Sequence, residues 1–288
     1  MEPVRIAVIG GSGLYNMPEF TDATEHRIDT PFGPTSDAII VGNLRGQRVA
    51  FVPRHGRGHV LSPSEVPYRA NIYALKTLGV TTVIAVSACG SLKLELAPGH
   101  IVVPDQLFDY TKDERGRSFF GGGIVAHVGV ADPFCPSLSR VVCEACQSAG
   151  GTVHEGGTFV TIEGPRFSTK GESQVWRQMG FSIIGMTTSP EAFLAREAEM
   201  HYAVMAHVTD YDVWHEEQVS SEAVFAQFNS NIALAQRSVA ETVERIATSN
   251  FVCGCESALK VAFATQRERV SPEVVQRLQP IIGKYFPS

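Results

Sequence analysis

Two carboxylates at the end of a buried apolar stretch offer the clearest chemistry in the chain. Residues 202–208 are mostly apolar and β-leaning, as in a strand buried on both faces, and Asp210 and Asp212 follow. Ligands of open α/β sheets bind beyond the carboxyl ends of strands, and acids two apart in an extended chain share one face. The pair therefore predicts a ligand site, although Asp is also typical of a helix N-cap or a solvated turn.

A glycine-rich loop follows the first apolar stretch of the chain. Gly10-Gly11-Ser12-Gly13 would let backbone N–H groups approach an anion, and a plain tight turn is the alternative. Asn16 stands where a dinucleotide fingerprint needs its third glycine, and no Gly-Lys-Ser/Thr of a Walker A loop follows.

Basic side chains gather at the end of another expected strand. Arg54, His55, Arg57 and His59 lie within six residues of an otherwise acidic chain. An Arg fork binds two phosphate oxygens at once, so the segment favours an anion site. The two histidines also have a spacing that suits a metal, but the intervening glycines oppose a helix and no acidic ligand is near. A solvated loop is the third interpretation.

Small and hydroxylated residues mark two more segments of interest. Ser87 and Ala88 lie at the end of a third apolar strand. This strand end could meet the other two loops at one phosphate, or the three loops could lie on the same edge of the sheet without meeting. Phe167 is able to stack on a flat base, Met186 to lie under a sugar and Thr187 to donate its hydroxyl. Taken singly, an aromatic or a Met more often packs in a core.

The six cysteines do not form the pattern of a disulfide scaffold. Cys143-x-x-Cys146 lies inside an expected helix without a second ligand pair, so zinc is weakly indicated there. Cys253-Gly-Cys255 is interpreted as two structural or idle thiols, with a redox pair as the alternative. No metal site and no cofactor are expected from these patterns.

Composition and charge exclude several classes of protein. The chain has 288 residues, of which 44% are hydrophobic and 19% charged, typical of a globular protein. Its net charge of -6 argues against a general nucleic-acid binder. No apolar run approaches the ~20 residues that span a bilayer, and the N-terminus lacks a signal-peptide core, so a cytoplasmic protein is expected.

The elements that must position these groups alternate between strands and helices, which predicts one α/β domain over residues 1–288. The chain shows no repeat and no linker-like composition. Residues 110–123 are polar and glycine-rich, and a mobile loop is one interpretation. Strands are expected at 4–9, 37–42, 48–53, 81–87, 101–103, 152–162 and 181–185, and helices at 63–78, 136–149, 169–179, from 189, at 220–247 and from 271.

Six motifs occur in a fixed order along the chain: Gly-Gly-Ser-Gly at 10–13, Arg-His-Gly-x-x-His at 54–59, Ala-Cys-Gly-Ser at 88–91, Glu-Gly-Pro-Arg-Phe-Ser at 163–168, Met-Thr-Thr-x-Pro-Glu at 186–191 and Thr-Asp-Tyr-Asp-x-Trp at 209–214. In this order they resemble those of the trimeric purine nucleoside phosphorylase family, and within it the enzymes that act on 5′-methylthioadenosine. The resemblance runs from Ile6 to about Ala247, and residues from about 250 to 288 match less clearly. It implies a mixed central sheet flanked by helices.

The resemblance implies a role for each matched residue. The purine would lie against Phe167, the ribose on Met186, and Ser168, Asp210 and Asp212 would line the N7 and 6-amino edge. His127, from a neighbouring subunit, and Val224 would line the 5′ pocket. Phosphate would be bound by Ser12, Arg54, His55, Ser87, the backbone of Ala88, and Thr187.

The implied reaction is phosphorolysis: phosphate attacks C1′ through an oxocarbenium-like state and releases the purine. A buried acid beside a second acid keeps its proton near neutral pH and can protonate N7, and we expect Asp210 to carry it. Inorganic phosphate would be the co-substrate, with no cofactor. A homotrimer, or a dimer of trimers, is implied, with a small-molecule nucleoside as partner and neither nucleic acid nor membrane.

Two features bear on substrate choice within the family. Relatives acting on 6-oxopurines carry Glu in place of Ser168 and Asn in place of Asp210, so this chain favours adenine and a methylthioadenosine substrate. Ser221 stands where methylthio-specific relatives often have an aliphatic residue, and Gly185 replaces a common Asn. Adenosine, methylthioinosine or inosine are therefore the alternative substrates. Two functions outside the family are also considered. A nicotinamide-dependent oxidoreductase is disfavoured because this chain lacks the third glycine of the dinucleotide fingerprint. A nucleoside-binding protein without catalysis would not need Arg54 and His55 at a phosphate site.

Overall fold

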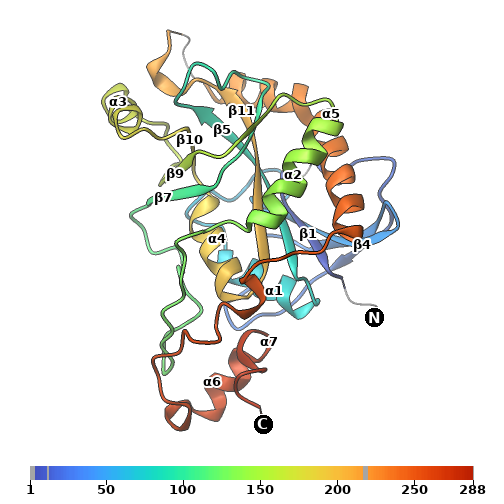
Figure 1. Cartoon of the computed structure of the whole chain (residues 1–288), viewed down its shortest axis with the longest axis vertical. Coiled ribbons are helices and arrows are strands. Elements are labelled where there is room, and N and C mark those ends of the chain that lie inside the picture. Colours follow the sequence, from blue (N-terminus) through green and yellow to red (C-terminus); the bar gives the residue numbers. More distant parts are fainter. Residues whose placement is uncertain (1–3, 12, 217–219, 288) are drawn as a thin grey trace.

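The central strand of the protein is β5 (Thr82–Ser91), which has parallel neighbours on both sides. These neighbours are β1 (Ile6–Gly10) and β11 (His201–Asp210), and the last residues of β5 pair antiparallel with β10 (Ile183–Gly185). The computed structural model (Figure 1) describes residues 4–11, 13–216 and 220–287. Three strands thus point their carboxyl ends in one direction, which is where an α/β sheet binds its ligands.

The remaining strands extend this centre into a mixed sheet. Its order is β2-β3-β4-β1-β5-β10-β9-β7, with β11 joined to β5 and β6, and β8 joined to β6. The added strands are β2 (Thr21–His26), β3 (Ile39–Leu44), β4 (Gln47–Pro53), β6 (Ile101–Val103), β7 (Gln106–Tyr110), β8 (Val153–Glu155) and β9 (Thr158–Ile162).

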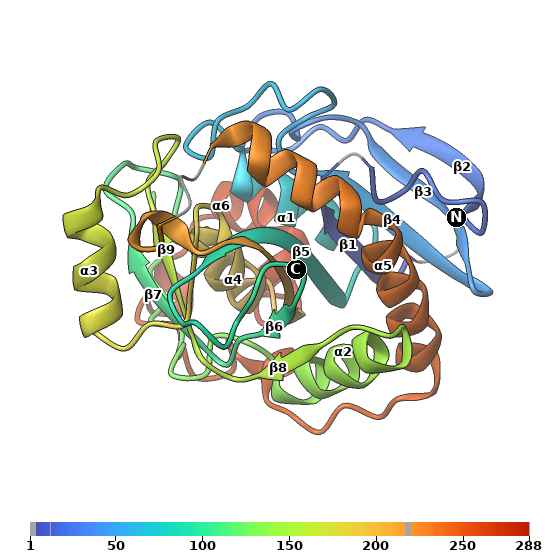
Figure 2. The same ribbon diagram turned by 90° about the horizontal axis from the view of Figure 1, so that it is seen from above.

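Helices cover both faces of the sheet, as Figures 1 and 2 show. Alternate residues of β11 divide between two cores: Tyr202 and Val204 face one, Ala203 and Met205 the other. Because side chains alternate along a strand, each face needs its own helical layer. The first core contains side chains of α1 (Tyr68–Thr77), α4 (Thr188–Glu197), α6 (Pro272–Arg277) and α7 (Gln279–Ile282), and the second those of α2 (Pro136–Ser148) and α5 (Ser221–Thr248).

The predicted α/β class with a mixed sheet is confirmed, but several predicted elements differ. The helix expected from residue 63 begins only at Tyr68, since Pro67 disfavours helical backbone in the residue before it. The strand expected over 152–162 is two strands, separated by Gly156 and Gly157 at φ 86° and 103°. Strands β2 and β7 were not predicted, because their exposed or half-exposed sequences lack a buried apolar run.

The loop over 110–123 is anchored rather than free. Arg115 is buried and pairs with Glu163 at 2.6 Å, while Arg117 pairs with Asp109 at 2.5 Å. These ion pairs argue against the interpretation of this segment as mobile. Within the described ranges, no helix combines the length and the apolar character that crossing a bilayer requires.

Candidate functional site

A cavity of about 290 Å³ lies beyond the carboxyl ends of the central strands. It brings together side chains from six separate segments of the chain, including almost all of the motifs. His127 is exposed and does not line it, and Ser12 lies outside the described residues. The predicted site residues that line the cavity are Arg54, His55, Ser87, Ala88, Phe167, Ser168, Met186, Thr187, Asp210, Asp212 and Val224.

Three buried polar atoms in this cavity have no hydrogen-bond partner in the described part of the chain. They are the hydroxyl oxygens of Ser87 and Ser168 and Oδ2 of Asp212. A buried polar atom without a partner costs free energy, so such atoms are rare unless a ligand or water pairs with them. Their position around one cavity indicates that a polar ligand belongs there.

His55 presents an acceptor to one end of the cavity. Its Nδ1 lies 2.9 Å from the carbonyl oxygen of Leu61, so the ring donates there, and Nε2 has no hydrogen-bond partner among the described residues. Burial and the neighbouring charge of Arg54 lower the pKa of His55 to about 4, which keeps the ring neutral. A neutral ring with an unprotonated Nε2 can accept a hydrogen bond from a ligand hydroxyl, such as the P–OH of a phosphate ion.

Arg54 holds its guanidinium differently from the sequence-based expectation. Nε and Nη2 each lie 2.8 Å from a carboxylate oxygen of Glu191, and the backbone oxygens of Val86 and Ile9 accept two more bonds. Four of the five N–H groups of an arginine are thus engaged, and the fork that was expected to bind two phosphate oxygens binds Glu191 instead. One N–H of Nη1 is left to face a ligand.

Glu191 belongs to a fully buried network beneath this end of the cavity. Its side chain is 2% exposed, and Oε1 also accepts from the hydroxyl of Tyr202 at 2.8 Å. Ser189 has the extended backbone of an N-cap (ψ 133°), so the acid falls in the first turn of the regular part of α4. A buried ion pair needs such additional hydrogen bonds to offset its desolvation.

The acid pair at the other end of the cavity depends on a β-bulge. The register between β11 and β5 shifts between Val208 and Asp210, which sets Asp210 opposite Gly90. The chain then turns, because Asp212 has φ 51° and begins a 3-10 turn, so an extended chain does not explain why the two acids meet. A Cβ at Gly90 would lie 2.9 Å from Oδ1 of Asp210, so a side chain there would displace the carboxylate.

Both carboxyls have environments that favour the protonated form. Burial raises the pKa of Asp210 and of Asp212; the hydroxyl of Ser173 lowers that of Asp212, and the nearby Asp210 raises it. Oδ1 of Asp210 accepts from the Asp212 backbone N–H at 2.7 Å, and Oδ2 lies 2.8 Å from the Thr209 hydroxyl. The Thr209 hydroxyl donates to Asp210 and also lies 3.2 Å from the Cys89 carbonyl, and its bond and that of the Asp212 N–H lower the pKa of Asp210, against the larger effect of burial.

Arg115 holds the two loops that carry Phe167 and Met186. It pairs with Glu163, just before the Phe167 loop, and Nη1 donates to the Met186 carbonyl at 2.6 Å. Gly164 has φ 66°, and a Cβ there would lie 2.5 Å from the Met186 sulfur. These contacts keep an aromatic ring and a thioether on one wall of the cavity.

The remaining end of the cavity is partly apolar and open to solvent. Ser221, Val224 and Phe225, in the first turns of α5, line it together with His59. The ring of His59 stacks on His55 at 4.2 Å and meets the edge of Phe225 at 5.7 Å. Phe225 is 49% exposed, so no part of the chain that the structure describes covers this end fully.

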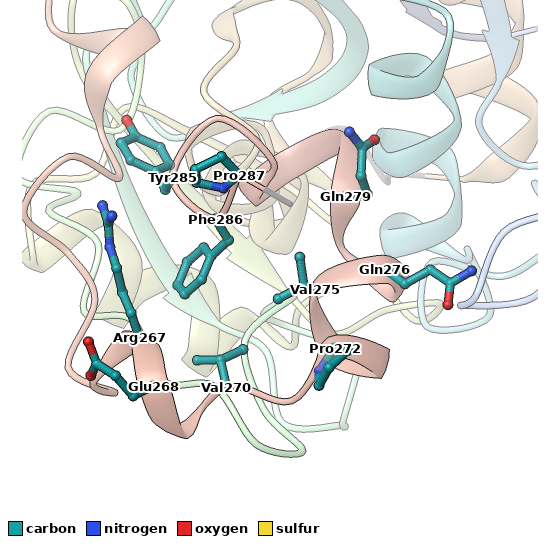
Figure 3. Close-up of a pocket in the computed structure, with 10 residues that line it drawn as sticks. All are labelled: Arg267, Glu268, Val270, Pro272, Val275, Gln276, Gln279, Tyr285, Phe286 and Pro287. Carbon is teal, nitrogen blue, oxygen red and sulfur yellow. The ribbon is translucent and has the colours of Figure 1, made fainter.

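A second, larger hollow of about 700 Å³ lies among the C-terminal helices. Figure 3 shows Val270, Val275 and Phe286 turned towards it, with glutamines at its margin. None of the predicted site residues lines this hollow. Its size alone therefore does not make it the site of the chemistry.

The sequence did not identify the residues that hold other site residues in position. Glu191 was noted only as an acid at a helix start, Thr209 only as part of a motif, and Arg115 as part of a loop. Each lies in a motif or segment with a polar pattern, but only the fold shows which distant partner it meets. Phe225 looked like one more apolar residue of an amphipathic helix.

Comparisons with known proteins agree with this geometry. A model of the phosphorylase superfamily matches residues 5–247. The chain is 54% identical to S-methyl-5′-thioadenosine phosphorylase of Chloroflexus aurantiacus and 51% identical to that of Geobacter sulfurreducens, covering 99% of this chain and 100% of each relative.

Solved structures show the same likeness. A methylthioadenosine phosphorylase from an Antarctic soil metagenomic library is 47% identical with a TM-score of 0.94, covering 98% of this chain and 99% of that one. The Schistosoma mansoni methylthioadenosine phosphorylase, in complex with adenine, is 35% identical with a TM-score of 0.86, covering 91% and 99%. The chain belongs to the phosphorylase superfamily, among relatives that are S-methyl-5′-thioadenosine phosphorylases.

Proposed function

We propose that this protein catalyses the phosphorolysis of S-methyl-5′-thioadenosine to adenine and 5-methylthioribose 1-phosphate. The observation that carries the proposal is the set of three unpartnered polar atoms around one cavity, on Ser87, Ser168 and Asp212. One lies at the end with His55 and Arg54, and the others accompany the acid pair. The names of the full-length relatives support the same substrate.

The phosphate end orients the nucleophile. Nε2 of His55 accepts a hydrogen bond from the P–OH group, and the Ser87 and Thr187 hydroxyls and the remaining Arg54 N–H donate to other oxygens. The hydrogen-phosphate ion is thereby turned so that an unprotonated oxygen faces C1′. Holding both reactants in one geometry replaces a bimolecular encounter and lowers the barrier.

The opposite end prepares the leaving group. Adenine departs as an anion unless N7 is protonated, and a positioned acid contributes ~10²–10⁴ in rate. Burial raises the pKa of both Asp210 and Asp212, which favours the pair sharing one proton that is available to the purine. We assign the N7 proton to Asp210, and the free Oδ2 of Asp212 accepts from the 6-amino group. A 6-oxo purine would instead place an acceptor against that oxygen.

Adenosine is the second candidate substrate. Ser221 lines the end of the cavity next to Val224 and Phe225, so a hydroxyl and apolar groups are both available to the 5′ substituent. The kcat/KM for methylthioadenosine divided by the kcat/KM for adenosine measures how far the pocket prefers the thioether.

We also propose that the active form is a homotrimer or a dimer of trimers. Support comes from the open 5′ end, where Phe225 is exposed, and from His127, which is exposed on the surface of its own chain. A neighbour's His127 would complete the pocket across a symmetric interface. Light scattering with an activity assay tests this, and a fully active monomer would contradict it.

The reaction is tested by incubating the purified protein with methylthioadenosine in the presence and absence of phosphate. Adenine release that requires phosphate supports the proposal. Release at an equal rate without phosphate indicates a hydrolase, and the absence of release under both conditions rejects catalysis on this substrate.

A further inference from the structure

Four side chains with metal-binding atoms meet at the end of β11 that is remote from the cavity. They are Cys135, His201, Cys253 and Cys255, and their ligand atoms all lie within 4.8 Å of one another. His201 begins β11 and Asp210 ends it, so the cluster lies ~30 Å from the acid pair along the strand. Cys143 and Cys146, the pair with a familiar zinc spacing, are buried residues of α2 and do not belong to this group.

The distances match the edges of a small tetrahedron. Cys135 Sγ lies 3.6 Å from Cys253 Sγ, and Nδ1 of His201 lies 3.4 Å from the first sulfur and 3.2 Å from the second. Zinc bonds of ~2.3 Å to sulfur and ~2.0 Å to nitrogen give tetrahedral edges of about 3.8 Å and 3.5 Å. These three ligand atoms thus need to move by only a few tenths of an ångström, and Cys255 Sγ lies within 4.8 Å of each of them.

The surroundings of the cluster suit a metal-bound state. Nε2 of His201 faces Oε1 of Glu256 at 3.3 Å, the carboxylate–histidine arrangement that orients a metal ligand. The Leu138 N–H donates to Cys135 Sγ at 3.5 Å, and Arg196 Nη1 donates to Cys255 Sγ at 3.4 Å. Three thiolates and one Zn²⁺ carry a net charge of −1, which the arginine balances.

We propose that Cys135, His201, Cys253 and Cys255 bind one structural zinc ion. Binding exchanges three thiol protons for the metal, without oxidation or reduction. Four protein ligands complete a tetrahedron and leave no open position, so the metal would not act on a substrate. This proposal replaces the sequence-based expectations of a chain without metal and of idle thiols at 253 and 255.

The site would fix the C-terminal segment to the sheet. Cys135 caps α2, His201 starts β11, and the two other ligands lie in the segment that leads from α5 to the last helices. That segment has little regular structure, so a metal that joins three distant parts of the chain restricts its unfolded state strongly.

Metal analysis of the untagged wild-type protein tests the proposal directly. After dialysis against metal-free buffer with a thiol reductant, we expect about one zinc ion per chain. X-ray absorption at the zinc edge should show three sulfurs at ~2.3 Å and one nitrogen at ~2.0 Å. A zinc content below about 0.1 per chain, even after incubation with zinc, would overturn the proposal. A zinc coordination shell made only of oxygen and nitrogen would also overturn it. So would a zinc-free protein whose mass is two hydrogens lower than expected, because that mass identifies a disulfide.

Variants locate the metal. Cys253→Ser and His201→Ala should lower the zinc content, whereas Cys143→Ala, which removes a thiol outside the cluster, should retain it. Glu256→Gln should retain zinc but bind it with ~10-fold lower affinity, measured by competition with a chelator, because Glu256 orients a metal ligand. Equal zinc content in all of these variants would place the metal elsewhere and refute the assignment. The wild-type absorption spectrum decides the matter if a variant does not fold.

Discussion

Removing the hydroxyl of Ser87 should change phosphate binding and stability in opposite directions. Its oxygen is buried with no partner among the described residues, and the residue is 7% exposed. In the ligand-free protein, Ser87→Ala therefore loses no hydrogen bond, and removing an unsatisfied polar group should leave the free energy of unfolding unchanged or raise it by up to ~1 kcal/mol. With phosphate bound, the variant lacks a bond to a charged group worth ~1.5–3 kcal/mol.

That loss corresponds to a ~10- to 150-fold increase in the KM for phosphate. The assay is initial rates at varied phosphate and saturating nucleoside, together with urea denaturation of the ligand-free protein. Ser139→Ala is the matched control, because its hydroxyl is also buried without a partner but lies in α2, away from the cavity. An unchanged KM for phosphate in Ser87→Ala would show that this hydroxyl does not face the anion. A clear loss of stability would show that it already has a partner.

Four further substitutions test other parts of the account. Asp210→Asn should lower kcat/KM for methylthioadenosine by ~10²-fold or more and favour methylthioinosine, and equal losses on both would contradict a role at the purine edge. Glu191→Gln should cost ~3–5 kcal/mol in urea unfolding because it leaves buried Arg54 unpaired, and an unchanged midpoint would refute this. Ser221→Val should favour methylthioadenosine over adenosine by ~1–3 kcal/mol in the ratio of kcat/KM, and a constant ratio would place Ser221 outside the 5′ pocket. Burial raises the pKa of Glu197 to about 7 from 4.5, so stability should fall as pH rises between these values, and Glu197→Gln should raise stability by ~2–3 kcal/mol at pH 8 and little at pH 4. A variant with the same pH dependence as wild type would show that Glu197 is not the group that titrates.

The sequence predicted the sheet well where strands are buried on both faces. The apolar runs of β1, β5 and β11 have few alternative structures, and they end at the loops that line the cavity. Strands β2 and β7 escaped prediction because pairing with a neighbour, rather than burial, makes them strands. The glycines at 156 and 157 broke a predicted strand through positive φ, which composition does not reveal.

The site residues were predictable as types, and their partners were not. Arg54 was recognised as a charge near a strand end, but its fork faces Glu191, which lies 137 residues later in the sequence. The proximity of Asp210 and Asp212 was expected from an extended chain, whereas a bulge and a turn produce it. The cluster around His201 joins residues 135 to 255, so no local spacing indicates it.

The fate of oxygen in the reaction tests the central claim most directly. The protein is incubated with methylthioadenosine and phosphate labelled with oxygen-18 at every position, and the sugar product is analysed by mass spectrometry. Attack of phosphate on C1′ predicts a methylthioribose phosphate that retains every labelled oxygen, including the one bonded to C1, together with an equal amount of adenine. Adenine accompanied by unlabelled free methylthioribose would mean that water is the nucleophile and would contradict the account.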